Sequence, residues 1–364
     1  MKTIAIILNS YHNAGPSNVM KALMHYLKLF GYCVMLITLL NKNSREEIKL
    51  LKEDGIATFE LDYPNKKTAL LYAPRSIRRI VNEYKIDVIH SNSLISDSIS
   101  ILSGTTAKHT CTLHNNMFYN YYGHYGKIVS RFMVKLHLFV LQRMDRCICC
   151  SKYIYDDIKD HINHVVVIRN GVDKPNATLI KKEEMNIPDN GVVFVYAGVL
   201  NSRKNALWLA KSFSTHRLPN EYLLILGDGQ DSSTLKELND DNIIIQGFVD
   251  TPTEYFQFSD VYISASLSEG FSLSVLESLS CGNYLLLSDI PSHRELIELC
   301  DTTYIGSLFS LTDDDGYVNA LNNVRSNLGR KNRKKVMTIA NEVFSAKKMT
   351  HMYELVFNEI HNNS

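Results

Sequence analysis

Short apolar runs alternate with segments of helical spacing along nearly the whole chain, and this alternation constrains the fold more than any other feature. The expected strands are residues 4–9, 33–40, 57–61, 87–90, 109–113, 146–150, 165–168, 192–197, 222–226, 243–246, 260–263 and 284–287. Helix-like segments fill the intervals between them. Such alternation is typical of parallel sheets covered by helices. We therefore predict an α/β protein.

Length and composition set the domain count and exclude several classes of protein. The 364 residues suffice for two domains of ordinary size, and 45% apolar with 21% charged residues fits a soluble globular protein. A net charge of +1 argues against nucleic acid as a partner. The first apolar run, residues 4–8, is too short for a secretion signal and is expected to be a buried strand.

The seven cysteines favour a reducing compartment. Their number is odd and most of them lie in strand-like runs, so we expect a cytoplasmic protein. The cluster Cys147, Cys149 and Cys150 has no second Cys or His cluster at a zinc-finger spacing, which favours buried small side chains over a metal site.

Residues 264–282, SASLSEGFSLSVLESLSCG, form the stretch with the clearest functional signal. A strand-like run precedes a loop rich in Ser and Gly, and a helix-like segment follows it. The first N–H groups of a helix have no internal partner, so such a loop is a natural anion site, and Gly270 lets the backbone approach a ligand. Glu269 and Glu277 bracket the turn, with seven residues between them.

Glu277 has two interpretations from its local sequence. Residues 274–277 read Ser-Val-Leu-Glu, which is also the pattern of a capping box at the start of a helix. In that case the carboxylate serves the helix terminus. A ligand contact is the alternative, and the two roles are compatible if each carboxylate oxygen serves one of them.

The motif E-G-F-x-L-x-x-x-E followed by S-x-x-C-G resembles the E-x7-E signature of the retaining glycosyltransferases of family 4. Residues 165–173, VVVIRNGVD, and the G-D-G of residues 227–229 resemble further segments of that family, so the resemblance covers nearly the whole chain. It implies the GT-B architecture of two facing Rossmann-like domains with parallel sheets. The implied boundaries are an N-terminal acceptor-side domain (1–173), a linker (174–190), a donor domain (191–343) and a C-terminal helix packing back on the first domain (344–364).

The resemblance also assigns roles to single residues. Glu269 is expected to face the sugar, together with His114, which follows a strand where the family has its active-site histidine. Lys204 matches the lysine that holds the donor diphosphate, whereas Val199 stands at the position of the usual arginine, and we hypothesise that Arg203 replaces that charge. The other expected donor-binding residues are Gly15, Phe248, Gly270, Phe271, Ser272, Leu273, Ser274 and Glu277, the last through ribose hydroxyls.

Several of these positions keep an ordinary structural alternative. The loop of residues 13–18 lacks the G-x-G-x-x-G fingerprint, which gives no support for a nicotinamide cofactor, and it is equally a plain turn with Ser17 as a helix cap. Phe248 is equally a core residue. A histidine at a strand end, such as His90 or His114, is more often only hydrogen-bonded than catalytic.

The implied function is retaining transfer of a hexosyl group from a nucleotide-diphosphate-sugar, with a UDP-sugar favoured over a GDP-sugar. The implied acceptor is a saccharide or lipid-linked saccharide, as in surface polysaccharide biosynthesis. No cofactor or metal is expected, since no Asp-x-Asp motif is present to hold a divalent ion. The alternatives are a sugar-nucleotide epimerase, or a catalytically impaired sugar-nucleotide-binding partner subunit, for which Val199 is the only indication.

Residues 117–144 are long, aromatic and basic, with Tyr119, Tyr121, Tyr122 and Tyr125 followed by Lys127, Arg131, Lys135 and Arg143. From residue 128 the apolar residues recur at helical spacing. A packed helix with one solvated face is the favoured interpretation. Peripheral contact with the inner membrane surface is the alternative. No run of about 18 apolar residues predicts a membrane span.

Overall fold

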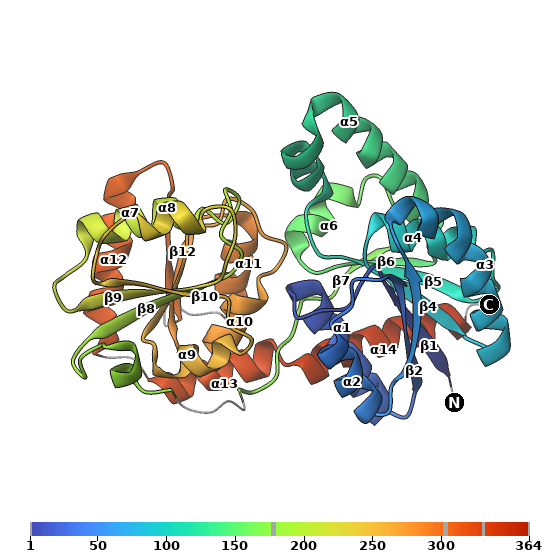
Figure 1. Cartoon of the computed structure of the whole chain (residues 1–364), viewed down its shortest axis with the longest axis horizontal. Coiled ribbons are helices and arrows are strands. Elements are labelled where there is room, and N and C mark those ends of the chain that lie inside the picture. The colour runs from blue at the N-terminus through green and yellow to red at the C-terminus, as the bar shows by residue number, and fades with distance from the viewer. Residues whose placement is uncertain (1, 176–179, 301–304, 330–331, 363–364) are drawn as a thin grey trace. The chain divides into compact units, whose positions relative to one another are not determined.

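The computed structural model describes residues 2–175, 180–300, 305–329 and 332–362. The chain divides into two compact units, Met1–Gly171 with Ala346–Ser364 and Val172–Ser345. Each unit contains one parallel sheet with helices packed on it (Figure 1). The predicted α/β class is therefore confirmed, including the C-terminal helix that belongs to the first unit.

The first unit is built on a seven-stranded sheet in the order β3-β2-β1-β4-β5-β6-β7. Its strands are β1 Thr3–Leu8, β2 Cys33–Leu40, β3 Ala57–Tyr63, β4 Val88–Ser91, β5 Lys108–Leu113, β6 Arg146–Cys149 and β7 Val165–Val167. Its helices are α1 Gly15–Leu29, α2 Arg45–Glu53, α3 Lys66–Tyr84, α4 Leu94–Leu102, α5 Met117–Leu141, α6 Lys152–Ile158 and α14 Ala346–Asn362. The nearly continuous apolar runs of β1 and β2 are buried on both faces, as parallel strands require.

Helix α14 is the C-terminal helix that returns to the first unit, where it lies beside α1 (Figure 1). Its Tyr353 hydroxyl bonds Thr112 Oγ1 of β5 at 2.8 Å. Asn358 Oδ1 accepts a hydrogen bond from Lys2 Nζ at 2.7 Å. His90 of β4 bonds Thr110 and Thr112, and its ring packs against Tyr353 and Phe357. His90 is thus a satisfied core histidine.

The second unit contains a six-stranded sheet in the order β10-β9-β8-β11-β12-β13. Its strands are β8 Val192–Ala197, β9 Glu221–Leu226, β10 Ile243–Gly247, β11 Val261–Ser264, β12 Tyr284–Ser288 and β13 Gly306–Phe309. Its helices are the 3-10 turn η1 Lys182–Met185, α7 Ala206–His216, α8 Ser232–Lys236, α9 Pro252–Phe258, α10 Leu273–Ser280, α11 Pro291–Leu299, α12 Asp314–Leu328 and α13 Arg333–Val343. Strand β13 has no counterpart among the strands expected from the sequence.

The segment predicted as a linker, residues 174–190, is grouped with the second unit. Residues 176–179 of that segment lie outside the described residues. The 3-10 turn within it is tied to β8 by Lys182 Nζ, which donates to the Gly191 carbonyl at 2.7 Å. Among the described residues, no helix is both long and apolar enough to cross a membrane.

Candidate active site

Four loops meet at the carboxyl ends of the neighbouring strands β10, β9, β8 and β11 in the second unit. The loop of residues 198–205 follows β8, and that of residues 265–272 follows β11. Backbone bonds join the ends, from Gly198 N to Leu226 O at 2.9 Å and from Gly227 N to Gly247 O at 2.7 Å. Ligands of open parallel sheets bind in this position, outside the carboxyl ends of the strands.

The G-D-G turn after β9 supports the loop that carries Lys204. Gly227 has a φ of 146°, and a Cβ there would lie 1.9 Å from the Gly198 carbonyl oxygen. A Cβ on Gly229 would lie 2.3 Å from the Leu200 carbonyl oxygen. Both glycines are needed because two backbone segments touch, so the turn fixes the path of residues 198–200.

Glu269 is the most strongly held side chain of this site. It is only 6% exposed. Lys204 Nζ lies 2.6 Å from its Oε1, and Arg203 Nη1 lies 3.2 Å from its Oε2. Arg203 Nη1 also donates to the Ser268 carbonyl at 2.5 Å, and Leu267 N donates to the Arg203 carbonyl at 2.8 Å. The β8 and β11 loops are thus joined into one charged cluster.

The charges around Glu269 keep it ionised. Burial by itself raises the pKa of Glu269, but the adjacent charges of Lys204 and Arg203 outweigh burial and lower the pKa to about 2. The carboxylate is therefore a permanent negative charge at neutral pH, held in a water-poor loop. Such a group suits the stabilisation of positive charge on a reacting atom.

Helix α10 begins at Leu273, with Ser272 as its N-cap residue and no side-chain cap bond. Ser274 lies inside the helix, so the capping-box interpretation of Ser274 and Glu277 is wrong. Glu277 instead sits in the second turn, half-buried, and its carboxylate forms no ion pair with a described residue. Burial raises the pKa of Glu277 to about 7.

In the first unit, a cavity of about 600 Å³ lies at the carboxyl ends of β1, β4 and β5. His114 follows β5 and lines it, and burial lowers the pKa of His114 to about 4, so the ring is neutral at pH 7. Its Nε2 is buried without a hydrogen-bond partner among the described residues. A buried ring nitrogen of this kind is available to a ligand hydroxyl.

Comparison with known proteins places the chain among sugar-transferring enzymes. The family model described as Glycosyltransferase Family 4 matches residues 14–174, and that described as Glycosyl transferases group 1 matches residues 191–327. The O-antigen biosynthesis glycosyltransferase WclY of Escherichia coli is 26% identical in an alignment of 382 positions that covers 98% of each chain. The chain is a glycosyltransferase of the GT-B fold.

Two further proteins resemble this glycosyltransferase. The UDP-Gal:alpha-D-GlcNAc-diphosphoundecaprenol alpha-1,3-galactosyltransferase of Escherichia coli is 26% identical in an alignment of 314 positions that covers 78% of this chain and 79% of that one. The crystal structure of Anabaena HepE in complex with UDP-glucose superimposes with a TM-score of 0.79 at 15% identity, over 99% of this chain and 100% of that one.

The structure brings most of the sequence-predicted donor residues of the glycosyltransferase to one edge of the second sheet. Arg203, Lys204 and Glu269 are in contact, and Gly270, Phe271, Ser272, Leu273, Ser274 and Glu277 follow along the loop and α10. The Phe271 ring is buried against Phe344 at 5.7 Å between centroids, so its own contact with a donor is limited to the backbone.

Two local alternatives are settled by exposure and by helix boundaries. Phe248 is 63% exposed after β10, so its interpretation as a core residue is wrong. Val199 is 57% exposed at the rim of the β8 loop. In the first unit Gly15 is the first residue of α1, whose N-cap is Ala14, and Ser17 lies inside the helix; Ser17 as the cap is therefore wrong.

Sequence reasoning missed His293 of α11. His293 is buried, its Nδ1 donates to the Ser288 carbonyl at 2.8 Å, and its Nε2 has no partner among the described residues. Burial lowers its pKa, and its charge interactions reach Glu269 and Lys204. The sequence carries no motif at residues 291–293, so only the folded chain reveals this neutral ring beside the charged cluster.

Helix α5 has a packed face, on which Val134, Val140 and Leu141 are buried, and an exposed face that carries apolar side chains. Ile128 is 86% and Phe132 66% exposed, and Val129, Leu136 and Phe139 are also exposed. Residues 117–144 contain no acidic residue, while Lys127, Arg131, Lys135 and Arg143 are basic. Exposed apolar surface is common at interaction sites of proteins in general.

Proposed function

We propose that this glycosyltransferase transfers a hexosyl residue from a UDP-sugar, with retention of anomeric configuration and without a metal ion, to a saccharide carried on a polyprenyl diphosphate. The observation that carries the proposal is Glu269, a buried carboxylate kept ionised by Lys204 and Arg203 at the carboxyl edge of the second sheet. Surface polysaccharide synthesis is the process in which we place the reaction, on the basis of the O-antigen relatives.

The chemistry requires opposite charges at neighbouring points. The anomeric C–O bond to the diphosphate breaks and a bond to the acceptor oxygen forms on the same face, while the acceptor proton passes to a diphosphate oxygen. Lys204, Arg203 and the first N–H groups of α10 face the growing negative charge on the diphosphate. Glu269 stabilises the positive charge of the sugar ring.

Arg203 is suited to replace the charge missing at Val199. Its two contacts with described residues both use Nη1, and a guanidinium has five N–H donors. The remaining donors are available to a phosphate oxygen. Two cations then face a diphosphate that carries about two negative charges, which matches the requirement of the leaving group.

The proposed acceptor is argued from a relative, and the proposed membrane contact from the exposed residues of α5. One relative transfers galactose from UDP-Gal to a GlcNAc on diphosphoundecaprenol, by its name. An enzyme with a polyprenyl substrate must work at a bilayer, and the exposed apolar residues of α5 together with Lys127, Arg131 and Lys135 suit an anionic membrane surface. We place the protein in the cytoplasm, peripheral to the inner face of the membrane.

The test combines a donor screen with product analysis. Thermal shift with UDP-glucose, UDP-galactose, UDP-N-acetylglucosamine and GDP-mannose should show stabilisation by UDP-sugars, about 2.7 kcal/mol at 100 times the dissociation constant. With a panel of alkyl-diphosphate-linked monosaccharides, UDP release should depend on the acceptor and survive EDTA. NMR of the product should show an α linkage from an α donor. A β linkage, a requirement for metal, or stabilisation by GDP-mannose alone would each overturn the corresponding part of the proposal.

A further inference from the structure

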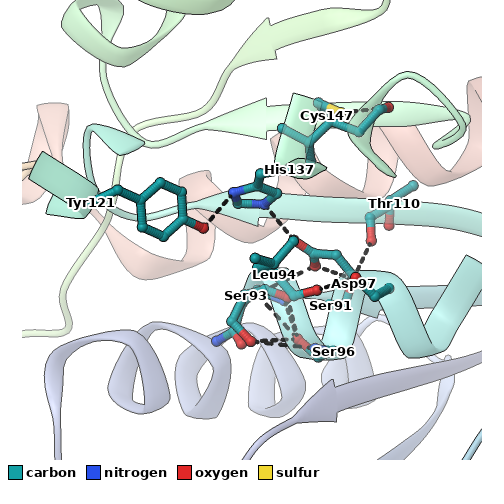
Figure 2. Close-up of polar contacts among 12 residues, drawn as sticks. Ser91, Ser93, Leu94, Ser96, Asp97, Thr110, Tyr121, His137 and Cys147 are labelled. Atoms are coloured by element: carbon teal, nitrogen blue, oxygen red, sulfur yellow. Dashed lines mark hydrogen bonds and ion pairs between the residues drawn. The ribbon is translucent and has the colours of Figure 1, made fainter. Parts of the chain in front are cut away.

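The cavity of the first unit contains a built hydrogen-bond chain that the reaction described above does not use. Tyr121 and His137, both of α5, line this cavity. The Tyr121 hydroxyl lies 2.9 Å from His137 Nδ1, and His137 Nε2 lies 3.1 Å from Asp97 Oδ2 (Figure 2). Asp97 of α4 is fully buried and His137 is nearly so. Three polar groups are therefore connected from the interior to the cavity wall.

The hydrogen-bond chain from Tyr121 to Asp97 exists because α5 is kinked. Tyr121 and His137 are 16 positions apart, which in a straight helix would separate them by about 24 Å. Gly126, between them, has φ 69° and ψ 170°, a conformation that other residues rarely adopt. Ser130 Oγ secures the bend because its one hydroxyl proton can be donated to either of two carbonyl oxygens, that of Tyr121 at 2.7 Å or that of Gly126 at 2.5 Å. The bend turns the first part of α5 back, so that Tyr121 reaches His137.

The inner end of the chain holds His137 in place. Asp97 Oδ1 accepts from Ser91 Oγ at 2.6 Å and from Ser93 N at 3.3 Å (Figure 2). A carboxylate only accepts, so His137 Nε2 is the donor in its bond to Asp97. The other ring nitrogen, Nδ1, then bonds the Tyr121 hydroxyl. A phenol hydroxyl both donates and accepts, so Tyr121 keeps hydrogen-bonding capacity for a group in the cavity.

We propose that Tyr121 binds the acceptor saccharide through a hydrogen bond between its phenol oxygen and one of the sugar hydroxyl groups, with His137 and Asp97 as positioning residues that hold the phenol in this orientation. The proposal rests on the proposed function: the donor cluster of Glu269, Lys204 and Arg203 lies in the second unit, which leaves the cavity of the first unit for the acceptor. The Tyr125 ring, 6.4 Å from that of Tyr121 between centroids, adds an apolar face for sugar C–H groups.

The test is a comparison of Michaelis constants for acceptor and donor. Tyr121→Phe should raise the acceptor KM by roughly 3- to 10-fold, the range for one lost hydrogen bond, and leave the donor KM unchanged. Tyr122→Phe is the matched control, because Tyr122 is the exposed next residue of α5 and is outside the cavity lining. It should change neither constant. The probes are alkyl-diphosphate-linked monosaccharides with a UDP-sugar.

A double-mutant cycle tests the positioning residues. Asp97→Asn should also raise the acceptor KM. The double variant, Tyr121→Phe with Asp97→Asn, should have an acceptor KM no higher than that of the poorer single variant, because both substitutions act through the Tyr121 hydroxyl. Additive effects would overturn the connection, and an unchanged acceptor KM in Tyr121→Phe would overturn the assignment of Tyr121. If the unsubstituted enzyme transfers sugar to none of the probes, the proposed function itself fails, which is a distinct result.

Discussion

Replacing Glu277 by glutamine is expected to stabilise the second unit at pH 8 and to have no effect on its stability at pH 4. The half-buried carboxyl has a pKa raised to about 7 by burial, and it forms no ion pair with a described residue. Glutamine has nearly the same shape and carries no charge. The substitution therefore removes the cost of ionising a carboxyl in this position and little else.

The sign and size follow from the two pKa values. Below a pKa of 4.5, the ordinary value for a glutamate in the unfolded chain, the Glu277 carboxyl is protonated in both states and does not lower the stability. Between 4.5 and 7 the unfolded chain ionises first, so stability falls as pH rises, and above 7 the penalty is constant. The difference between the folded and unfolded pKa of Glu277 corresponds to a loss of roughly 3 kcal/mol in the free energy of unfolding. Because the carboxyl is partly in contact with solvent, we expect a loss nearer to about 2 kcal/mol.

Urea unfolding at pH 4, 5, 6, 7 and 8 measures this difference directly. Glu298→Gln is the control, because Glu298 is exposed on α11 of the same unit. An equal gain at pH 4 and pH 8 would mean that packing, and not charge, is responsible. Destabilisation at pH 8 would mean that the carboxylate makes a favourable contact in the folded state, and the reasoning from burial would be wrong.

Three further results are expected. Glu269→Gln should abolish most transfer and lower the free energy of unfolding at pH 7 by roughly 1.5–3 kcal/mol, since two cations lose their counter-charge; unchanged turnover with urea stability intact would contradict both. Arg203→Ala should weaken UDP binding by roughly 1.5–3 kcal/mol in calorimetry, and Val199→Arg should restore much of it, whereas unchanged affinity would show that Arg203 does not contact phosphate. Phe132→Glu should reduce binding to anionic vesicles in sedimentation, whereas Leu71→Glu, at a residue of equal exposure on α3, should not; equal loss in both variants would exclude a specific role of α5.

The sheets could be predicted from the sequence because parallel strands are buried on both faces and appear as continuous apolar runs. Strand β13 was missed for the same reason. Its four residues, Gly306–Phe309, are buried only at their two ends and carry no such run. It is a strand because β12 presents a free edge, with Leu285 paired to Gly306 and Ser288 to Phe309. The free edge of β12 is a property of the folded sheet and leaves no pattern in residues 306–309.

The candidate site was predicted only where its residues are close in sequence. The spacing of Glu269 and Glu277 lies within one loop and helix, but whether Ser274 caps the helix depends on a start that differs by two residues between the prediction and the structure. The partners of Glu269 come from a loop 65 positions earlier, and the chain from Tyr121 to Asp97 depends on a bend at Gly126. Contacts at such separations leave no local pattern.

The two glutamates of the β11 loop and α10 show how one short segment provides two different carboxyl groups. Glu269 and Glu277 are both removed from water, which alone would raise both pKa values, yet one lies near 2 and the other near 7. The difference comes mainly from Lys204 and Arg203, which reach the first carboxylate. Groups whose surroundings drive their pKa values apart are suited to different tasks. Glu269 can therefore oppose a positive charge at any physiological pH, whereas Glu277 becomes a good acceptor for hydroxyl donors only when a bound ligand supplies the hydrogen bonds that its burial removed. Donor binding by Glu277 should consequently lower its own pKa, which links occupation of the site to release of a proton.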